Sequence, residues 1–494
     1  MNAVLKSQAV LVSSHGARIA LSVAIAAILG RNLAPEDFGF VALVSSIFLV
    51  AVEILDMGTI IVATRQIAAR PEQERETLTA LIGLRRLLSM IAFASVLVLA
   101  CTDYVSRQDQ RLVLVAAAFG IFLLHLQAYQ PVFHVRQAYG RLTALALGGQ
   151  LGFLLASAAA MKLLAGGAVI GLLVVAREIA LVLGTRWMAV RTLGYRLRAP
   201  WTHPGACWPL LRAGWMIGVA GLSYKLATYS GGFILWELSS PEALASFSAA
   251  QRLLVPMGDM AWLFVTPLIA AMSASVAYNA DEFRVQLEGY VKLLLGMSSL
   301  AAVAGFFLAP LVLRVLYGEM YVSAPRSAVG SFRWLALGYL FAVVSPVMVV
   351  GEMARGNTRA LMFTALACLA ANLAGNAWAI PRYGADGAAM AMFASEACVF
   401  LVLLARCVAR RDVRLSGLWA FYLVPASLLG MALWLLAGAP VWQLAVACAW
   451  VPASLFAITQ LPAQRACRAS VALTTAQWKR AAPPPGALNV GDSG

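Results

Sequence analysis

The sequence predicts an all-α, polytopic integral membrane protein with about 14 transmembrane helices, arranged as two six-helix lobes and a C-terminal helix pair. Its composition supports the membrane class. Hydrophobic residues make up 62% of the 494 residues and charged residues only 12%, whereas soluble globular proteins average about 45–50% apolar and about 25% charged residues. The mean hydropathy is +0.81. This balance excludes a disordered chain, a secreted disulfide scaffold and a cytosolic enzyme.

Fourteen apolar segments reach the roughly 20 residues that a helix needs to span a bilayer. The predicted spans are 10–30, 38–63, 84–101, 111–134, 143–164, 167–187, 208–236, 243–273, 289–309, 327–350, 360–380, 385–406, 417–438 and 440–461. The loops are short, so no large soluble domain is expected. No cleavable signal peptide is evident, and the first apolar segment is interpreted as a retained transmembrane helix.

Positive charge predicts the orientation of these spans. With the N-terminus placed in the cytoplasm, 25 of the 37 Lys and Arg residues fall on the cytoplasmic side and 8 on the other side. The cytoplasmic set includes Arg65, Arg70, Arg75, Arg85 and Arg86 between and at the ends of the predicted spans 38–63 and 84–101. This bias predicts that both termini are cytoplasmic. The net charge of +15 is attributed to these loops and to anionic lipid rather than to a nucleic-acid partner.

An internal repeat predicts how the chain is divided. Segments 33–39 and 238–247 each carry Pro-Glu in a short loop before a helix. Gly140 and Gly356 lie in similar segments 216 residues apart, as do Gly171 and Gly387. Six helices per repeat give a parallel repeat about an axis along the membrane normal, and such transporters bind substrate between the halves. The predicted parts are lobes 1–204 and 205–412, a terminal helix pair 413–462 and a disordered cytoplasmic tail 463–494.

Basic residues within the spans are the first candidates for a site. A charge in the bilayer costs about 2.5–3.5 kcal/mol on insertion scales, and it usually faces a cavity. Arg18, Lys225 and Arg252 lie in spans 1, 7 and 8. We expect them to line a central cationic cavity that suits an anionic substrate such as a phosphate or pyrophosphate head group. The alternative is that they pair with acidic residues and only fix helix packing.

Acidic residues in the spans have two possible roles, ion coupling or pairing with these cations. Glu53 and Asp56 lie three residues apart on one helix face, and Asp259 lies in span 8. Asp56 could instead end its helix, because Asp56-Met57-Gly58 interrupts the apolar run. The adjacent Arg177 and Glu178 are expected to pair with each other near a helix end.

The sequence carries no pattern typical of an enzyme or a metal site. It has no Gly-Lys dipeptide and so no Walker A loop, and it has neither an HExxH nor a GxSxG motif. The seven cysteines form no CxxC pair, and the four histidines do not cluster. We therefore expect a protein that is not an enzyme and that uses no metal and no cofactor.

Several segments, taken in order, carry a family resemblance. They are Leu29–Gly39 with Asp56-Met57-Gly58, Ser246–Leu253 with Pro256, Leu316–Tyr321 with Ala324-Pro325, and Gly356-Asn357-Thr358 with Asn372, Asn376 and Pro381–Ala389. Over residues 5–410 the chain resembles bacterial polysaccharide flippases, the Wzx-type O-antigen and exopolysaccharide transporters of the multidrug/oligosaccharidyl-lipid/polysaccharide (MOP) superfamily.

The resemblance implies a V-shaped bundle whose two lobes rock around a central cationic cavity. The implied substrate is an undecaprenyl-pyrophosphate-linked oligosaccharide, flipped across the bacterial inner membrane for surface polysaccharide synthesis. A polysaccharide polymerase and a chain-length regulator are the implied partners. Arg31 and Arg252, together with Arg18 and Lys225, are the residues that we carry over as substrate-binding candidates.

Three other functions remain open. A cation-coupled multidrug exporter of the same superfamily would favour acidic residues in its site, whereas the candidates here are mainly basic. A peptidoglycan-precursor (lipid II) flippase would share the fold and the lipid carrier. A membrane-embedded polysaccharide polymerase or ligase would need an extended outer loop to hold its acceptor, and none is expected in this chain.

Overall fold

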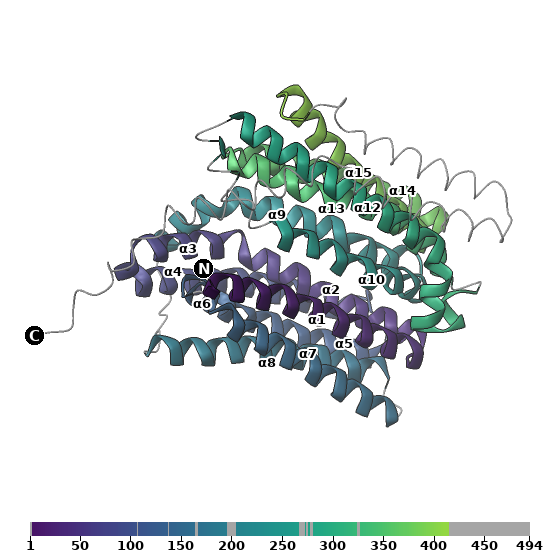
Figure 1. The fold of residues 1–494 in the computed structure, drawn as a ribbon. Helices are drawn as coiled ribbons and strands as arrows, with labels where there is room; N and C mark the ends of the chain where they lie inside the picture. Colours follow the sequence, from purple (N-terminus) through teal and green to yellow (C-terminus); the bar gives the residue numbers. More distant parts are fainter. Residues whose placement is uncertain are drawn as a thin grey trace, which may run out of the picture. The chain divides into compact units, whose positions relative to one another are not determined.

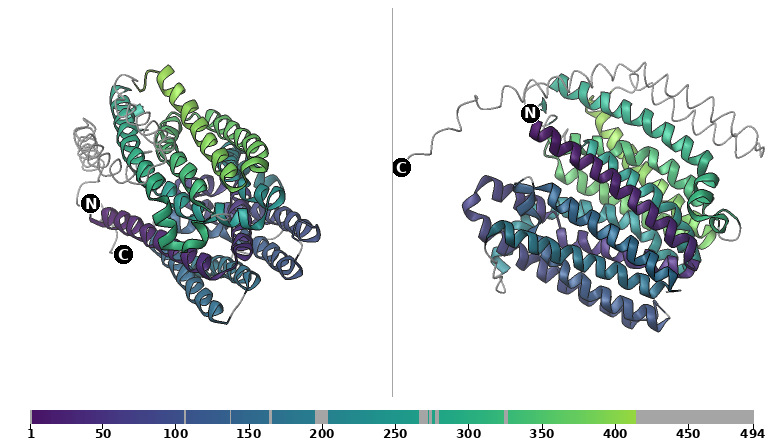
Figure 2. Two further views of the ribbon diagram at one scale, coloured as in Figure 1. Left: turned by 90° about the vertical axis from the view of Figure 1, so that its right-hand side faces the viewer. Right: turned by 60° about the horizontal axis from the view of Figure 1, so that its bottom comes forward.

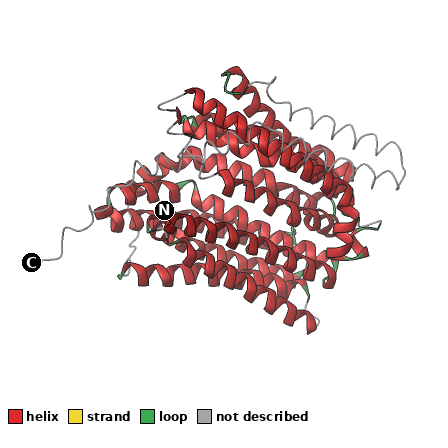
Figure 3. Cartoon of the chain, in the orientation of Figure 1, coloured by secondary structure: helices red, strands yellow, loops and turns green. Residues whose placement is uncertain are grey.

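The computed structural model describes residues 2–413, apart from 106, 137, 164–165, 195–203, 266–271, 273–274, 277–279 and 324–326. The regular elements of these residues are all helices (Figure 3). Nine helical segments of the described chain are long and apolar enough to cross a membrane. The all-α membrane fold is therefore confirmed. The last two predicted spans, the terminal helix pair and the tail lie outside the described residues, except for Val413.

Each of the first twelve predicted spans falls mainly on one helix or on consecutive helical segments (Figure 1). The α-helices are α1 (Asn2–Asn32), α2 (Pro35–Asp56), α3 (Thr59–Ala69), α4 (Glu74–Cys101), α5 (Gln108–Leu123), α6 (Gln130–Val135), α7 (Tyr139–Lys162), α8 (Gly167–Leu193), α9 (Pro204–Leu238), α10 (Pro241–Val265), α12 (Ala280–Tyr317), α13 (Val329–Ala354), α14 (Thr358–Tyr383) and α15 (Ala385–Ala409). Short 3-10 helices cover Pro71–Gln73, Leu124–Tyr129 and Glu319–Tyr321.

The predicted span 38–63 is interrupted, which corrects its boundaries. Helix α2 ends at Asp56, and Met57 and Gly58 follow with left-handed φ angles of 41° and 71°. The Asp56 carboxylate accepts a hydrogen bond from the backbone N–H of Ile60 at 3.2 Å, which satisfies a donor in the first turn of α3. The interruption that the sequence marks at Asp56-Met57-Gly58 is therefore a true break between two helices.

Helix α4 begins ten residues before its predicted span, at Glu74 rather than at residue 84. Glu74 and Glu76 lie in its first turn, where acidic side chains interact favourably with the helix dipole. As a consequence Arg85, which the prediction places at the cytoplasmic end of span 84–101, lies well inside the helix and is fully buried. Hydropathy alone places the start of this helix too late because its first turns carry charge.

The described chain forms two compact units. Of the described residues, unit 1 takes those within Met1–Met260, Gly305–Tyr339 and Thr358–Val399, and unit 2 takes those within Ala261–Ala304, Leu340–Asn357 and 400–413. Within unit 1, α2 packs against α8 and α9, α1 against α7, and α9 against α14 (Figures 1 and 2). The lobe boundaries at 204 and 412 stay a prediction.

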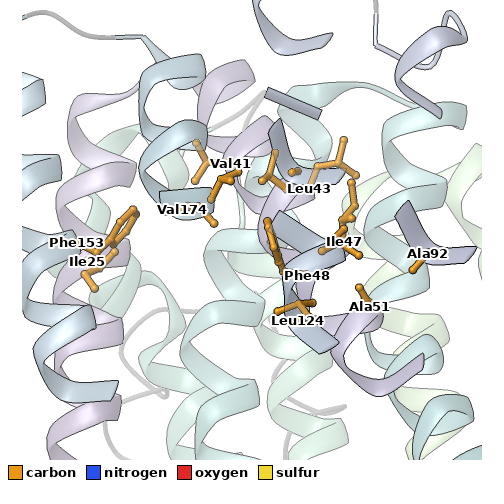
Figure 4. Close-up of a cluster of buried hydrophobic side chains, with 14 of the residues drawn as sticks. Ile25, Val41, Leu43, Ile47, Phe48, Ala51, Ala92, Leu124, Phe153 and Val174 are labelled. Atoms are coloured by element: carbon orange, nitrogen blue, oxygen red, sulfur yellow. The ribbon is translucent and has the colours of Figure 1, made fainter. Parts of the chain in front are cut away.

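Helix α2 is a centre of packing in unit 1. Its Phe38 and Phe40 are fully buried, and Leu43, Ile47 and Phe48 are almost so. Figure 4 shows Leu43, Ile47 and Phe48 along this helix with Leu124 and Ala92 nearby. Lipid tails are as apolar as these side chains, so helix association in a membrane depends on close fit rather than on removal from water.

Small residues allow a close backbone approach in unit 1, at the break after α2. A Cβ atom on Gly218 of α9 would collide with the backbone of Met57, and one on Gly58 would lie 2.6 Å from the carbonyl oxygen of Gly214. Residues without side chains therefore let the α2–α3 break lie backbone-to-backbone on α9.

Ion pairs organise the helix ends of unit 2. The buried Glu352 of α13 accepts hydrogen bonds from Arg406 at 3.2 Å, from Arg410 at 3.0 Å and from Asn357 at 2.9 Å. Arg355, which follows α13, donates two hydrogen bonds to the buried Asp412. This carboxylate raises the pKa of the Arg355 guanidinium above its ordinary value, because it stabilises the charged form.

Candidate functional site

Unit 1 contains a cavity of about 360 Å³ between α1, α2, α7, α8, α9 and α10. Its apolar wall includes Ile25, Val41, Phe153 and Val174. Figure 4 shows Ile25 of α1 beside Phe153 of α7, and Val41 of α2 near Val174 of α8. The cavity therefore adjoins the hydrophobic core of unit 1, because these four residues belong to both.

Charged side chains line this cavity with an excess of positive charge. Three arginines and one glutamate belong to its wall: Arg18 of α1, Arg177 and Glu178 of α8, and Arg252 of α10. The formal charges of these four side chains give a net charge of +2. Charge–charge interactions are stronger in a site walled by apolar helices than in water. The cavity is therefore suited to an anion.

The Arg252 guanidinium packs against an aromatic ring, and a tyrosine anchors the backbone of its helix nearby. Its guanidinium lies 5.1 Å from the centre of the Phe38 ring, a cation–π arrangement. Three residues earlier on α10, the Ala249 carbonyl accepts a hydrogen bond of 3.0 Å from the Tyr317 hydroxyl. The Nη2 atom of Arg252 is buried and has no hydrogen-bond partner among the described residues. Arg252 thus presents an unused donor at the cavity.

Arg177 is in a different situation, because Glu178 accepts its hydrogen bonds, one of them 3.1 Å long from Nε. Its guanidinium also lies 5.2 Å from the centre of the Phe153 ring. The expected pairing of Arg177 with Glu178 is present. The pair lies in the middle of α8 and lines the cavity, not near a helix end.

Neutral polar side chains complete the lining. They are Ser22, Ser45, Ser46, Gln150, Tyr229, Ser248 and Gln251. The Gln251 amide donates a 2.7 Å hydrogen bond to the Thr228 carbonyl of α9, and the Ser45 hydroxyl donates one of 2.8 Å to Val41 within its own helix. The Oε1 atom of Gln150, in contrast, is buried and has no partner among the described residues.

The four predicted substrate-binding residues do not come together. Arg18 and Arg252 line the cavity, whereas Lys225 and Arg31 are not among its lining residues. Arg31, at the end of α1, donates a 2.8 Å hydrogen bond to the Leu316 carbonyl and another to that of Val315. It therefore caps the last turn of α12, where a cation is favourable.

None of the three predicted acidic residues is among the described residues that line the cavity. The carboxylate of Glu53 lies against Gly221 of α9, close enough to Lys225 for an electrostatic interaction. Asp56 forms an ion pair of 2.6 Å with Arg85 of α4. The side chain of Asp259 lies outside the described residues.

Sequence reasoning missed Arg85 and Gln150. Arg85 is fully buried beside Asp56, but its position near charged helix turns is typical of a loop flank. Gln150 has no charge, and a single amide in an apolar span gives little signal in hydropathy. The spacing of Ala146, Gln150 and Phe153 along one helix face could have placed it with the aromatic ring.

Within the described residues, no group of three or more His, Cys, Asp or Glu side chains could hold a metal ion. What the cavity offers is therefore a binding surface made of guanidinium groups, hydroxyls and amides. Such a surface can hold a molecule that has both an anionic part and a polar, uncharged part.

Known proteins resemble this chain in sequence and in fold. A family model described as polysaccharide biosynthesis protein matches residues 4–273. The lipid II flippase MurJ in an inward closed conformation matches with a TM-score of 0.68 and 13% identity, covering 90% of this chain and 97% of that chain. No curated protein sequence matches.

Two MATE transporters share the fold as well. An inward-facing multidrug resistance MATE family transporter of the MOP superfamily matches with a TM-score of 0.60 and 15% identity, covering 80% of this chain and 94% of that chain. A MATE transporter of Vibrio cholerae matches with a TM-score of 0.50 and 14% identity, covering 83% and 96%. These structural matches establish the fold.

Proposed function

Because the chain belongs to the polysaccharide biosynthesis protein family, we propose that it flips undecaprenyl-pyrophosphate-linked oligosaccharide repeat units across the bacterial inner membrane. Surface polysaccharide or exopolysaccharide is the end product of this route. Sugars do not cross hydrocarbon unaided, because each buried hydroxyl without a partner costs free energy. A polar cavity within the bundle removes that cost, and no covalent step is needed.

The observation that carries this proposal is the charge of the cavity. A diphosphate esterified at both ends carries two negative charges, and the four charged lining residues carry a net charge of +2. Arg252 offers a buried donor with no partner among the described residues, as an anion-binding group would. The serine, tyrosine and glutamine side chains supply the hydrogen bonds that sugar hydroxyls require.

The remaining parts of the proposal follow from the sequence. The two predicted six-helix lobes alternate between open states around the cavity, and both termini lie in the cytoplasm, as the distribution of Lys and Arg predicts. A polysaccharide polymerase and a chain-length regulator act on the flipped repeat units. These partners are inferred from the family resemblance alone.

Two related functions are alternatives. A MATE-like exporter of cationic drugs would need carboxylates in its site, and the cavity has one glutamate, which is paired with Arg177. A lipid II flippase would bind the same diphosphate group, and the MurJ fold is similar. The experiment that tests the function must therefore identify the lipid-linked sugar.

The decisive experiment is to delete the gene in its native host while the downstream pathway stays intact. Undecaprenyl-linked oligosaccharides are extracted and weighed by mass spectrometry, and surface polymer is measured in parallel. We expect complete single repeat units to accumulate while surface polymer disappears. The wild-type gene should restore the polymer, and the Arg252→Gln variant should not.

Two outcomes would contradict the proposal. Unchanged surface polymer together with increased drug sensitivity would favour the exporter. Accumulation of lipid II with arrest of cell-wall synthesis would favour the peptidoglycan-precursor flippase.

A further inference from the structure

Resting on the proposed function, we propose that Gln150 of α7 is a specificity-determining residue, which recognises a hydroxyl or amide N–H group of the sugar next to the diphosphate. The cavity would thus read the first sugar as well as the anion. Two lining residues of one cavity, Gln150 and Arg252, each carry a buried polar atom without a partner among the described residues, one an acceptor and the other a donor.

Gln150 carries a hydrogen-bond acceptor without a partner among the described residues. Gln150 lines the cavity, and its Oε1 atom is buried and has no hydrogen-bond partner among the described residues. A buried polar atom without a partner is costly, and native structures contain few of them. A ligand that donates a hydrogen bond to this oxygen would remove the cost.

Arg252 carries a hydrogen-bond donor without a partner among the described residues. Arg252 of α10 lines the same cavity, and its Nη2 atom is also buried and lacks a partner among the described residues. A diphosphate offers only acceptor oxygens when it is a fully ionised diester. It can satisfy Arg252, but it has no hydrogen to give to Gln150. One ligand that satisfies both atoms must join an anion to a nearby O–H or N–H group.

Other lining groups are already engaged as donors. The Gln251 amide donates to Thr228, and the Ser45 and Ser46 hydroxyls donate to Val41 and Ala42 within α2. Their hydrogens hold the helices rather than a ligand. Gln150 differs from Gln251 because, among the described residues, its amide oxygen is buried and has no partner.

The surroundings of Gln150 place it near the anion-binding side. Ala146, Gln150 and Phe153 line the cavity from one face of α7 at positions i, i+4 and i+7. The Phe153 ring lies 5.2 Å from the Arg177 guanidinium. A sugar at Gln150 would thus lie on the same side of the cavity as Phe153 and the Arg177–Glu178 pair.

The test compares two soluble probes of equal charge that differ in the sugar. They are P1-farnesyl-P2-glucosyl diphosphate and P1-farnesyl-P2-methyl diphosphate. Binding to the purified full-length protein in detergent is measured by isothermal titration calorimetry. We expect the wild-type protein to bind the glucosyl probe about fivefold to tenfold more tightly, as one neutral hydrogen bond allows.

The variants separate the two parts of the ligand. Gln150→Met keeps the side-chain length but removes the amide, so it should bind both probes with the wild-type affinity for the methyl probe. Arg252→Gln should weaken both probes by roughly the same factor, about tenfold or more. Gln110→Met, a change at another buried glutamine that does not line the cavity, is the control and should keep the discrimination.

The outcomes distinguish the two levels of the proposal. If the wild-type protein binds both probes and Gln150→Met keeps the preference for glucose, or if the wild-type protein shows no preference, the role of Gln150 is wrong and the transporter of a lipid-linked diphosphate stands. If the wild-type protein binds neither probe, the proposed function fails, and the inference fails with it.

Discussion

Two arginines of unit 1, Arg85 and Arg252, lie on apolar helices and have opposite surroundings. Arg85 of α4 is fully buried and forms an ion pair of 2.6 Å with Asp56. Its Nε and Nη1 atoms also have no hydrogen-bond partner among the described residues, but Arg85 has a counter-charge and does not line the cavity. Arg252 of α10 lines a cavity, stacks on Phe38 and keeps its Nη2 atom without a partner among the described residues. The same residue type therefore has a structural role at one place and is available to a ligand at the other.

The difference shows that a charge in an apolar span does not reveal its own role. Burial of a charge is tolerated where a counter-charge or hydrogen bonds compensate it. Where the compensation comes from the chain, as at Asp56, the pair fixes packing. Where the chain leaves a donor unused beside a cavity, the missing partner points to a ligand.

The largest effect is expected on stability, when the buried Arg85 loses its counter-charge. Asp56→Ala removes the counter-charge of a fully buried guanidinium and should lower the free energy of unfolding by about 3–5 kcal/mol. Thermal unfolding in detergent would measure the loss. Adding Arg85→Met to Asp56→Ala should recover part of the stability, because no unpaired charge then remains. A single variant as stable as the wild-type protein would contradict the structural role of the pair.

The next effect tests the ligand side. Arg252→Gln should lower affinity for a diphosphate lipid about tenfold to a hundredfold, because a charge-assisted hydrogen bond is lost. The thermal midpoint should change little, since Arg252 has no carboxylate partner among the described residues. Arg252→Lys should recover only part of the binding, because an ammonium lacks the planar fork. Normal transport by a protein carrying both Arg18→Gln and Arg252→Gln would refute the cationic cavity.

A smaller effect extends the comparison to unit 2. Glu352→Gln removes the charge that binds Arg406 and Arg410, whose side chains are 34% and 36% exposed. Because water screens these arginines, we expect a loss of about 1–2 kcal/mol rather than the full cost of a buried pair. Asp281→Asn is the matched control, since Asp281 is 87% exposed and pairs with Arg284 at the surface. Equal losses in the two variants would show that burial does not matter here.

The smallest effect concerns Lys225. Its side chain lies near Glu53 and does not line the cavity. Lys225→Met should therefore leave the affinity for a diphosphate lipid unchanged within about twofold, which corresponds to less than roughly 0.5 kcal/mol. Titration with the glucosyl and methyl probes would measure it. A loss as large as that of Arg252→Gln would place Lys225 in the binding site after all.

Much of the fold could be predicted from the sequence. Apolar segments mark the first twelve spans, and Asp56-Met57-Gly58 marks the break after α2 because left-handed backbone suits glycine. The motif resemblance to polysaccharide flippases is confirmed by the family model. The start of α4 was missed because its first turns carry charges that lower the hydropathy.

The site was harder to predict. A helical sequence shows which residues share a face, but not how far that helix is rotated relative to its neighbours. Arg18 and Arg252 turn toward one cavity, whereas Lys225, equally placed in its span, turns toward Glu53. Arg31 caps α12 through backbone carbonyls that lie 284 and 285 residues further along the chain. A local sequence pattern cannot contain such a long-range contact.

The contact between the α2–α3 break and α9 has a consequence for how this chain can vary. At Gly218 the neighbouring atoms belong to the main chain of Met57, so a new methyl group would collide with backbone atoms. A second substitution at position 57 cannot remove these atoms. We expect a saturation library to tolerate a single amino acid at Gly218. Position 57, which makes the contact through its backbone, should accept the short polar residues that adopt left-handed conformations, such as Asn. Position 218 would therefore always be glycine, whereas the residue at position 57 could vary.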